Sequence, residues 1–260
     1  MSIPYYQVDA FTSSLFSGNP AGVCLMADWL PDAVLQSIAA ENNLAETAFV
    51  VQRDSYFDLR WFTPTVEMDL CGHATLASAH VIVRHLGYRD SVVRFHTRSG
   101  VLTVTRNDDL LTLDFPARPA AVCPAPADLL EGLGCPPTAT AKARDYLAVF
   151  DTEQAIRDLR PEMAALERLD CLGVIVTAPG ERCDFVSRFF APGAGVPEDP
   201  VTGSAHCTLI PYWAQRLGRS QLRALQVSQR GGELLCEHRG ERVGIAGQAV
   251  TYSSGFLHVS

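Results

Sequence analysis

Two short stretches of this chain place a glycine between polar side chains that could bind or move a proton: Cys71-Gly72-His73 and Thr202-Gly203-Ser204. Each glycine opens an apolar run that predicts a buried helix. The first backbone N–H groups of a helix lack partners within the helix and carry partial positive charge. Glycine also lets a ligand approach this backbone closely. Both helix starts therefore predict binding of a substrate carboxylate or other oxyanion, the alternative being that both glycines serve close helix–strand packing.

Glu46 is the only charged residue between Asn42 and Val50, where a predicted helix gives way to a predicted strand. Apolar surroundings stabilise the protonated form of a carboxyl group, which suits a general acid or base near neutral pH. His73 is placed to relay a proton or to donate to a substrate oxygen. The alternatives are a surface carboxylate for Glu46 and a capping or packing role for His73.

The chain has eight cysteines and no C-x-x-C pair, so the usual zinc and redox spacings are missing. Most are expected to be buried free thiols. Cys71 differs because it directly precedes a helix-start glycine, and helix starts favour thiolates. If Cys71 takes part in chemistry, its thiol is expected to have a low pKa. No metal site is predicted.

The surroundings of the two helix starts resemble each other, which indicates an internal repeat. Matching features are separated by 128 to 132 residues: Arg60–Pro64 with Arg188–Pro192, Glu67 with Glu198, Leu30-Pro31 with Arg160-Pro161, and Arg98–Gly100 with Arg230–Gly232. The order and common spacing of these matches predict two copies of a unit of about 130 residues. The two proline pairs are expected to open helices.

One copy is predicted to consist mostly of strands around one buried helix. The expected strands are Tyr5–Phe11, Gly22–Met26, Ala48–Gln52, Phe57–Phe62, Val92–His96, Val101–Arg106 and Leu110–Phe115. The expected helices are Pro31–Asn42 and Gly72–Leu86, and Gly203–Leu217 in the second copy, where Pro211 should kink the helix or shift its start. The predicted halves are 1–118 and 138–260, joined by a proline-rich linker, 119–137, with the last strand free to return to the first half.

Differences between the copies point to specialised positions. Aligning the copies sets Glu46 opposite Leu172, Asp199 opposite Met68, and His73 opposite Ser204. Residues kept in both copies serve the fold or a shared task, whereas Glu46, His73 and Asp199 occur once and are the candidates for catalysis. Gly72, Gly203, Ser204, Cys71 and Thr202 are the candidates for substrate binding.

Composition limits the possible partners. The chain of 260 residues is 47% hydrophobic and 19% charged, so it can build a sizeable core. Its net charge of −8 argues against nucleic acid or an anionic membrane as the main partner. No apolar run reaches the ~18 residues that a membrane span needs, and no secretory signal is visible, so a cytoplasmic protein is expected.

The motifs of the whole chain, in their order, resemble the phenazine-biosynthesis PhzF-like isomerase family. The resemblance rests on Asp9-Ala-Phe-Thr12, Gly18-Asn-Pro-Ala-Gly-Val23, Asn43-Leu-Ala-Glu-Thr47, Cys71-Gly-His-Ala-Thr75 and Glu198-Asp-Pro-Val-Thr-Gly-Ser-Ala205. It implies an α+β fold like that of diaminopimelate epimerase, with two pseudo-symmetric halves, each a β-barrel-like sheet around a central helix. Family analogy also suggests a homodimer.

The resemblance implies roles for individual residues. Glu46 would shuttle a proton between two substrate carbons, with Gly72, His73, Asp199 and Ser204 lining the site between the halves. No cofactor or metal is implied. The best-known member isomerises trans-2,3-dihydro-3-hydroxyanthranilate.

Three functions follow from the sequence. The first is a cofactor-independent isomerase of a small carboxylic acid, bearing an amino or hydroxy group, with Glu46 as the acid and base. The second is a thiol-dependent epimerase or racemase that uses Cys71, although Thr202 stands where the related two-thiol epimerases have a second cysteine. The third is a small-acid binding protein without chemistry.

Overall fold

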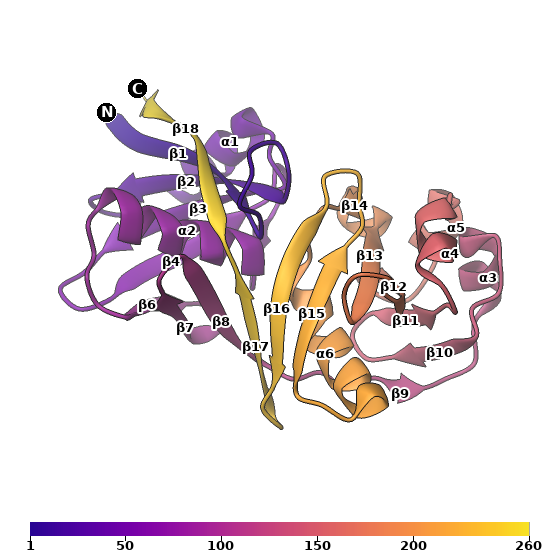
Figure 1. Cartoon of the computed structure of the whole chain (residues 1–260). Coiled ribbons are helices and arrows are strands. Elements are labelled where there is room, and N and C mark those ends of the chain that lie inside the picture. Colours follow the sequence, from indigo (N-terminus) through magenta and orange to yellow (C-terminus); the bar gives the residue numbers. More distant parts are fainter. Residues whose placement is uncertain (260) are drawn as a thin grey trace. The chain divides into compact units, whose positions relative to one another are not determined.

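The computed structural model describes residues 1–259 and divides into two compact units (Figure 1). The first unit comprises Met1–Asp114 and the chain from Ala246 onward, and the second comprises Phe115–Ile245. The final strand thus belongs to the first unit, because it pairs along its length with the first strand.

The first unit contains a mixed sheet with the strand order β18-β1-β2-β3-β4-β6-β7-β8, and β5 pairs with β4. The apolar residues of these strands alternate or run together as expected for sheets with one or two covered faces. The strands are β1 (Ser2–Ala10), β2 (Asn19–Met26), β3 (Glu46–Gln52), β4 (Phe57–Phe62), β5 (Glu67–Met68), β6 (Val92–Thr97), β7 (Gly100–Asn107), β8 (Leu110–Pro116) and β18 (Ala249–His258).

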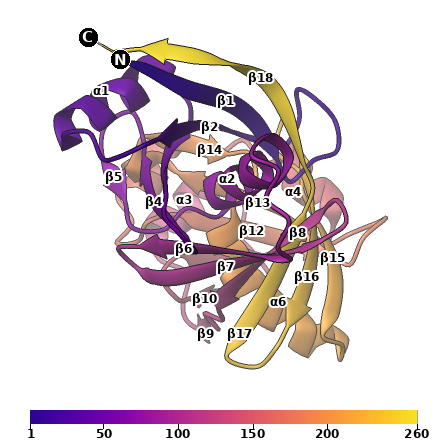
Figure 2. The same ribbon diagram turned by 90° about the vertical axis from the view of Figure 1, so that its left-hand side faces the viewer.

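Two helices cover this sheet. Helix α2 (Gly72–His85) packs against β1, β2, β3 and β18, and Figure 2 shows the curved sheet around it. Eleven of its 14 residues are buried, and most of these are small, which lets the strands approach closely. Helix α1 (Asp32–Asn42) contributes Leu35 and Ile38 to a separate core with Phe49 and Phe62.

The second unit repeats the order of strand pairing seen in the first. In the first unit β2–β3 is parallel, β3–β4 and β4–β5 antiparallel, β4–β6 parallel and β6–β7 antiparallel. The same series occurs for β11–β12, β12–β13, β13–β14, β13–β15 and β15–β16. These strands are β11 (Tyr146–Val149), β12 (Val174–Pro179), β13 (Phe185–Ala191), β14 (Val196–Asp199), β15 (Gln221–Gln226) and β16 (Gly232–His238).

The remaining elements complete the second unit. Helix α6 (Gly203–Leu217) follows β14 as α2 follows β5, and ten of its residues are buried. The others are β9 (Ala121–Val122), α3 (Ala127–Leu133), β10 (Ala139–Lys142), α4 (Glu153–Asp158), α5 (Met163–Glu167), a 3₁₀ turn at Pro192–Ala194, and β17 (Arg242–Gly247).

Each unit carries the same partly buried ion pair at positions that the sequence repeat aligned. Arg60 donates two hydrogen bonds to Glu67, from Nε and Nη2, at 2.7 and 2.8 Å. Arg188 donates the same two bonds to Glu198, at 2.8 and 2.9 Å. This two-pronged geometry fixes the strand that carries each arginine to the segment that leads into the buried helix.

One predicted boundary was wrong, and one predicted helix start was two residues early. The stretch 119–137 is not a linker, because α3 lies within it and Leu129 and Leu133 are buried in the core of the second unit. Its prolines flank this helix, with Pro126 at its start, and therefore do not interrupt it. The helix expected to open at Arg160-Pro161 begins two residues later, as the short α5, with Glu162 as its N-cap.

Pro211 lies inside α6 without shifting the start of the helix to a later residue. A proline has no N–H, so the carbonyl of Cys207, four residues earlier, loses its usual helical partner. The backbone N–H of Arg118 donates to that carbonyl instead, at 2.8 Å. A tertiary hydrogen bond thus makes an internal proline tolerable at this position.

Candidate active site

The N-terminal ends of β2 and β3 bring Asn19 and Glu46 to the same edge of the sheet. The two strands are parallel, and Ala21 lies opposite Glu46. Asn43 ends α1 in the left-handed conformation, with φ at 49°, which asparagine tolerates better than most residues. The chain then turns and enters β3 at Glu46, whose carboxyl group is thereby held at a strand start.

The start of α2 holds the next two side chains. Cys71 precedes the helix in an extended conformation, with φ −138° and ψ 115°, and Gly72 is the first helical residue. The hydroxyl of Thr75 donates to the carbonyl of Cys71, which ties the helix start down. Cys71 and His73 therefore have fixed backbones on either side of Gly72.

These elements bring four side chains of the first unit into contact. Oε2 of Glu46 lies 3.0 Å from Nε2 of His73, and both side chains are mostly buried, with 14% and 5% of their surfaces exposed. Nδ1 of His73 lies 3.1 Å from the amide nitrogen of Asn19 and 3.6 Å from Sγ of Cys71. The imidazole thus stands between a carboxylate on one side and an amide and a thiol on the other.

Burial and neighbouring charges change the pKa values of His73 and Cys71. Burial by itself would lower the pKa of His73, but the neighbouring Cys71 and Glu46 raise it well above its ordinary value. Burial, followed by the charge of Glu46, raises the pKa of Cys71 to about 11. The expectation of a low-pKa thiol at this helix start was therefore wrong: the thiol is protonated at neutral pH, because burial outweighs the helix end.

One set of side chains has donor atoms suited to a metal ion. A carboxylate oxygen of Glu46, Sγ of Cys71 and a ring nitrogen of His73 all lie within 4.8 Å of one another. The sequence had predicted no metal site, since the cysteine spacing shows none. The three residues meet only because a strand start and a helix start lie together.

The start of α6 carries a different network. Thr202 precedes the helix in an extended conformation, and its hydroxyl donates to the carboxylate of Asp199. The side chain of Gln226 accepts from the backbone N–H of Thr202 at 2.8 Å and donates to the carbonyl of Asp199 at 2.7 Å. Gln226 thereby holds the segment from Asp199 to Thr202 in place.

Two further side chains fix the first turn of α6. Nη2 of Arg144 donates to the hydroxyl of Ser204 at 3.1 Å, while the same guanidinium binds the buried carboxylate of Asp145. Nδ1 of His206 lies 2.8 Å from the carbonyl of Thr202. Burial lowers the pKa of His206 to about 4, so the ring is neutral and its Nδ1–H donates to this carbonyl.

The structure groups the predicted residues in two sets. Glu46, Cys71, Gly72 and His73 lie together in the first unit, and Asp199, Thr202, Gly203 and Ser204 lie together in the second. Sequence reasoning missed Asn19, Arg144 and Gln226 as their partners. Asn19 could have been found in the Gly18–Val23 motif, whereas Arg144 and Gln226 lie where no local pattern marks them.

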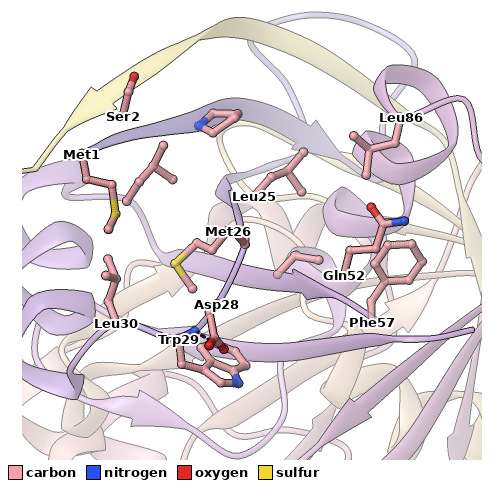
Figure 3. A pocket seen from close by; sticks show the side chains of 14 residues that line it. Met1, Ser2, Leu25, Met26, Asp28, Trp29, Leu30, Gln52, Phe57 and Leu86 are labelled. Carbon is pink, nitrogen blue, oxygen red and sulfur yellow. Dashed lines mark hydrogen bonds between the residues drawn. The ribbon is translucent and has the colours of Figure 1, made fainter. Parts of the chain in front are cut away.

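An apolar cavity of about 540 Å³ in the first unit contains none of these residues. It lies at the C-terminal ends of β2 and β3, away from Asn19 and Glu46. Met26 and Gln52 line it together with Met1, Trp29 and Phe57 (Figure 3). Its lining offers no contact between an acid and a base. The contact between Glu46 and His73 therefore identifies the candidate active site better than cavity size does.

Known proteins resemble this chain over its full length. Residues 8–255 match the sequence model of the family described as phenazine biosynthesis-like protein, PhzC-PhzF. An uncharacterised isomerase of Pseudomonas aeruginosa is 55% identical over 259 residues, with 100% of both chains covered. The human phenazine biosynthesis-like domain-containing protein is 40% identical over 290 residues, with 99% of both covered.

Solved structures agree with these matches. A phenazine biosynthesis protein of the PhzF family from Enterococcus faecalis superposes with a TM-score of 0.97 at 45% identity, with 100% of both chains covered. A hydroxyproline epimerase from Agrobacterium vitis shares the fold, with a TM-score of 0.65 at 12% identity, over 98% of this chain and 92% of the other. No helix within residues 1–259 is long and apolar enough to span a membrane. The chain is therefore a member of the phenazine biosynthesis-like PhzC-PhzF family, and an enzyme of the isomerase class.

Proposed function

We propose that this protein is a cofactor-independent isomerase that moves a proton between two carbons of a small amino or hydroxy carboxylic acid, with Glu46 as the general acid and base. The 3.0 Å contact between Glu46 and His73 carries this proposal. A mostly buried carboxylate beside an imidazole can accept a proton, hold it away from bulk water and return it.

In the proposed reaction, Glu46 removes a proton from one carbon, and the electron pair of that C–H bond spreads into the conjugated system of the substrate. The protonated Glu46 then returns this proton to another carbon on the same face, so substrate and product have the same composition. His73 would orient the Glu46 carboxyl group through its Nε2 contact, and the backbone N–H groups at Gly72 would bind an oxyanion of the substrate.

We further infer that the two units are pseudo-symmetric halves, each with a β-barrel-like sheet around its central helix, and that the second half also serves this substrate. Asp199 and Ser204 would orient polar groups of the substrate, and the α6 start at Gly203 would bind an oxyanion. The repeated strand pairings and the repeated Arg–Glu ion pair support this inference.

Replacement of Glu46 by Gln tests the proposal, because glutamine keeps the shape but cannot accept a proton. Small amino and hydroxy acids, starting with trans-2,3-dihydro-3-hydroxyanthranilate, are incubated with the enzyme in heavy water. Proton NMR then follows both isomerisation and exchange at carbon. Glu46→Gln should lower turnover about 10³-fold, within the range for general acid–base catalysis.

The matched control is Glu41→Gln, which changes an exposed glutamate of α1 and should leave turnover unchanged. Unchanged turnover in Glu46→Gln would refute the proposal. If Cys71→Ser abolished exchange while Glu46→Gln remained active, a thiol-dependent epimerase would take its place.

A further inference from the structure

We propose that Glu46, Cys71 and His73 form a binding site for one zinc-like divalent cation. Such an ion would occupy the carboxylate and the imidazole that the proposed isomerase needs, so it would inhibit turnover reversibly. The inhibition rests on the proposed function, whereas the binding rests only on the three side chains.

The donor set suits zinc. Zn²⁺ in proteins takes thiolate sulfur, imidazole nitrogen and carboxylate oxygen, at about 2.3 Å for sulfur and about 2.0–2.2 Å for nitrogen and oxygen. In a tetrahedral site, these bond lengths separate the ligand atoms from one another by about 3.3–3.6 Å. A site with three protein ligands leaves the fourth position open to water or to a small anion.

The present geometry is close to that requirement. Nε2 of His73 lies 3.0 Å from Oε2 of Glu46 and 4.0 Å from Sγ of Cys71, values on either side of the tetrahedral separation. All three donor atoms lie within 4.8 Å of one another. Small side-chain rotations would bring them to one ion, because a strand start and a helix start already fix their backbones.

Asn19 supplies the outer partner that a metal-bound imidazole needs. With Nε2 on the metal, Nδ1 carries the ring proton and requires an acceptor. The amide of Asn19 lies 3.1 Å from Nδ1, and turning this amide by half a rotation would present its oxygen. With its oxygen turned towards Nδ1, Asn19 would hold the buried ring in the orientation that metal binding requires.

Titration of the full-length, metal-free protein with Co²⁺ tests the proposal without any substrate. A thiolate–cobalt bond gives a near-ultraviolet charge-transfer band, and Zn²⁺ should displace the cobalt with loss of that band. We expect one equivalent to bind. Cys71→Ser should remove the band, and His73→Ala should weaken binding at least ~100-fold, beyond the cost of losing an outer partner. Asn19→Ala should weaken it about 10-fold.

Two control variants address competing sites. Cys135→Ser removes an exposed thiol, and His80→Ala breaks a second imidazole pair, in which His80 and His85 both contact the hydroxyl of Thr251, at 2.9 and 2.8 Å. Both variants should bind Co²⁺ like the natural protein, and circular dichroism checks that each variant is folded.

Persistence of the band in Cys71→Ser, its loss in Cys135→Ser, or the loss of binding in His80→Ala would overturn the proposal. None of these results depends on turnover. An active Glu46→Gln variant would therefore refute the proposed reaction but not the metal site. Failure of the natural protein to bind cobalt would refute the metal site but not the proposed reaction.

Discussion

The starts of α2 and α6 share a backbone plan. In both, an extended residue precedes a glycine, and the side chain four residues after the extended residue bonds its carbonyl. Thr75 does this for Cys71 with a hydroxyl, and His206 does it for Thr202 with a ring nitrogen. Two different residue types thus make the same bond to the carbonyl before each helix start.

The side chains around the two starts differ in chemistry. At α2, the carboxylate of Glu46 contacts the imidazole of His73 directly. At α6, by contrast, the carboxylate of Asp199 accepts from a hydroxyl, in a network that Gln226 completes. The first arrangement suits proton transfer, and the second suits the orientation of a bound molecule. A repeated scaffold thus leaves its polar side chains free to specialise.

The largest expected effect is on the pH dependence of stability, and it comes from His206, which binds the Thr202 carbonyl, whereas Thr75 at the other helix start does not titrate. The buried His206 has a pKa of about 4 in the folded protein, against ~6.5 when unfolded. Between these values the unfolded chain binds more protons, so stability that is present above pH 6.5 is lost as the pH falls towards 4. The loss amounts to about 3 kcal/mol.

His206→Thr places at α6 the residue type that Thr75 provides at α2. It should remove the contribution of His206 to the pH dependence of the free energy of unfolding. Urea unfolding at pH 7 and at pH 4.5 measures the free energy of unfolding of both proteins. His80, whose pKa is also about 4 because of burial and the neighbouring His85, contributes equally to both. Equal pH dependence in the two proteins would contradict the assignment of His206.

Asp199→Asn comes next and tests whether the α6 start takes part in turnover. The amide keeps an acceptor for the Thr202 hydroxyl but loses the charge. We expect turnover about 10²-fold lower, less than for Glu46→Gln, because in the proposed reaction Asp199 orients the substrate and Glu46 abstracts its proton. Asp170→Asn, at a fully exposed carboxylate, is the control. A loss equal to that of Glu46→Gln would assign proton transfer to both starts.

Gln226→Ala should have a smaller effect. It removes the bond to the buried Thr202 N–H and the bond to the partly buried Asp199 carbonyl. We expect a loss of about 1–2 kcal/mol in the free energy of unfolding. Turnover should fall about 10-fold, through a lower kcat with little change in KM, because Gln226 positions Asp199. Gln221→Ala, at the exposed start of the same strand, should change neither quantity.

The smallest effect concerns the ion pairs that both units share. Arg60→Lys and Arg188→Lys keep the charge but lose the two-pronged geometry. Each should lower the free energy of unfolding by about 1 kcal/mol and leave turnover unchanged. Thermal unfolding of the two variants, side by side, measures this. A large loss in only one variant would show that the two pairs do not play the same structural part.

Much of the fold could be predicted where a pattern is local. The apolar run and the flanking glycines predicted α6 over Gly203–Leu217, and the alternating strand Phe57–Phe62 coincides with β4. Prediction failed for 119–137, where the prolines suggested a linker. The spacing of Leu129 and Leu133 places both on one helix face, but proline content concealed it.

The candidate site could be predicted only in part. Glu46 and His73 were found because a lone charge and a helix-start histidine are visible along the chain. Asn19 and Gln226 were missed as partners, because each reaches its neighbours from a separate strand. Asn19 lies in the Gly18–Val23 motif, which could have singled it out, whereas no local pattern marks Gln226.

The sequence by itself determined that two glycine-led buried helices and one isolated carboxyl group would be present, because residue type and spacing along the chain are enough for that. Only the tertiary structure decided that Glu46, His73 and Cys71 meet, and that the Cys71 thiol keeps its proton at neutral pH. The physical reason is that proton affinity depends on burial and on charges brought near from distant parts of the chain.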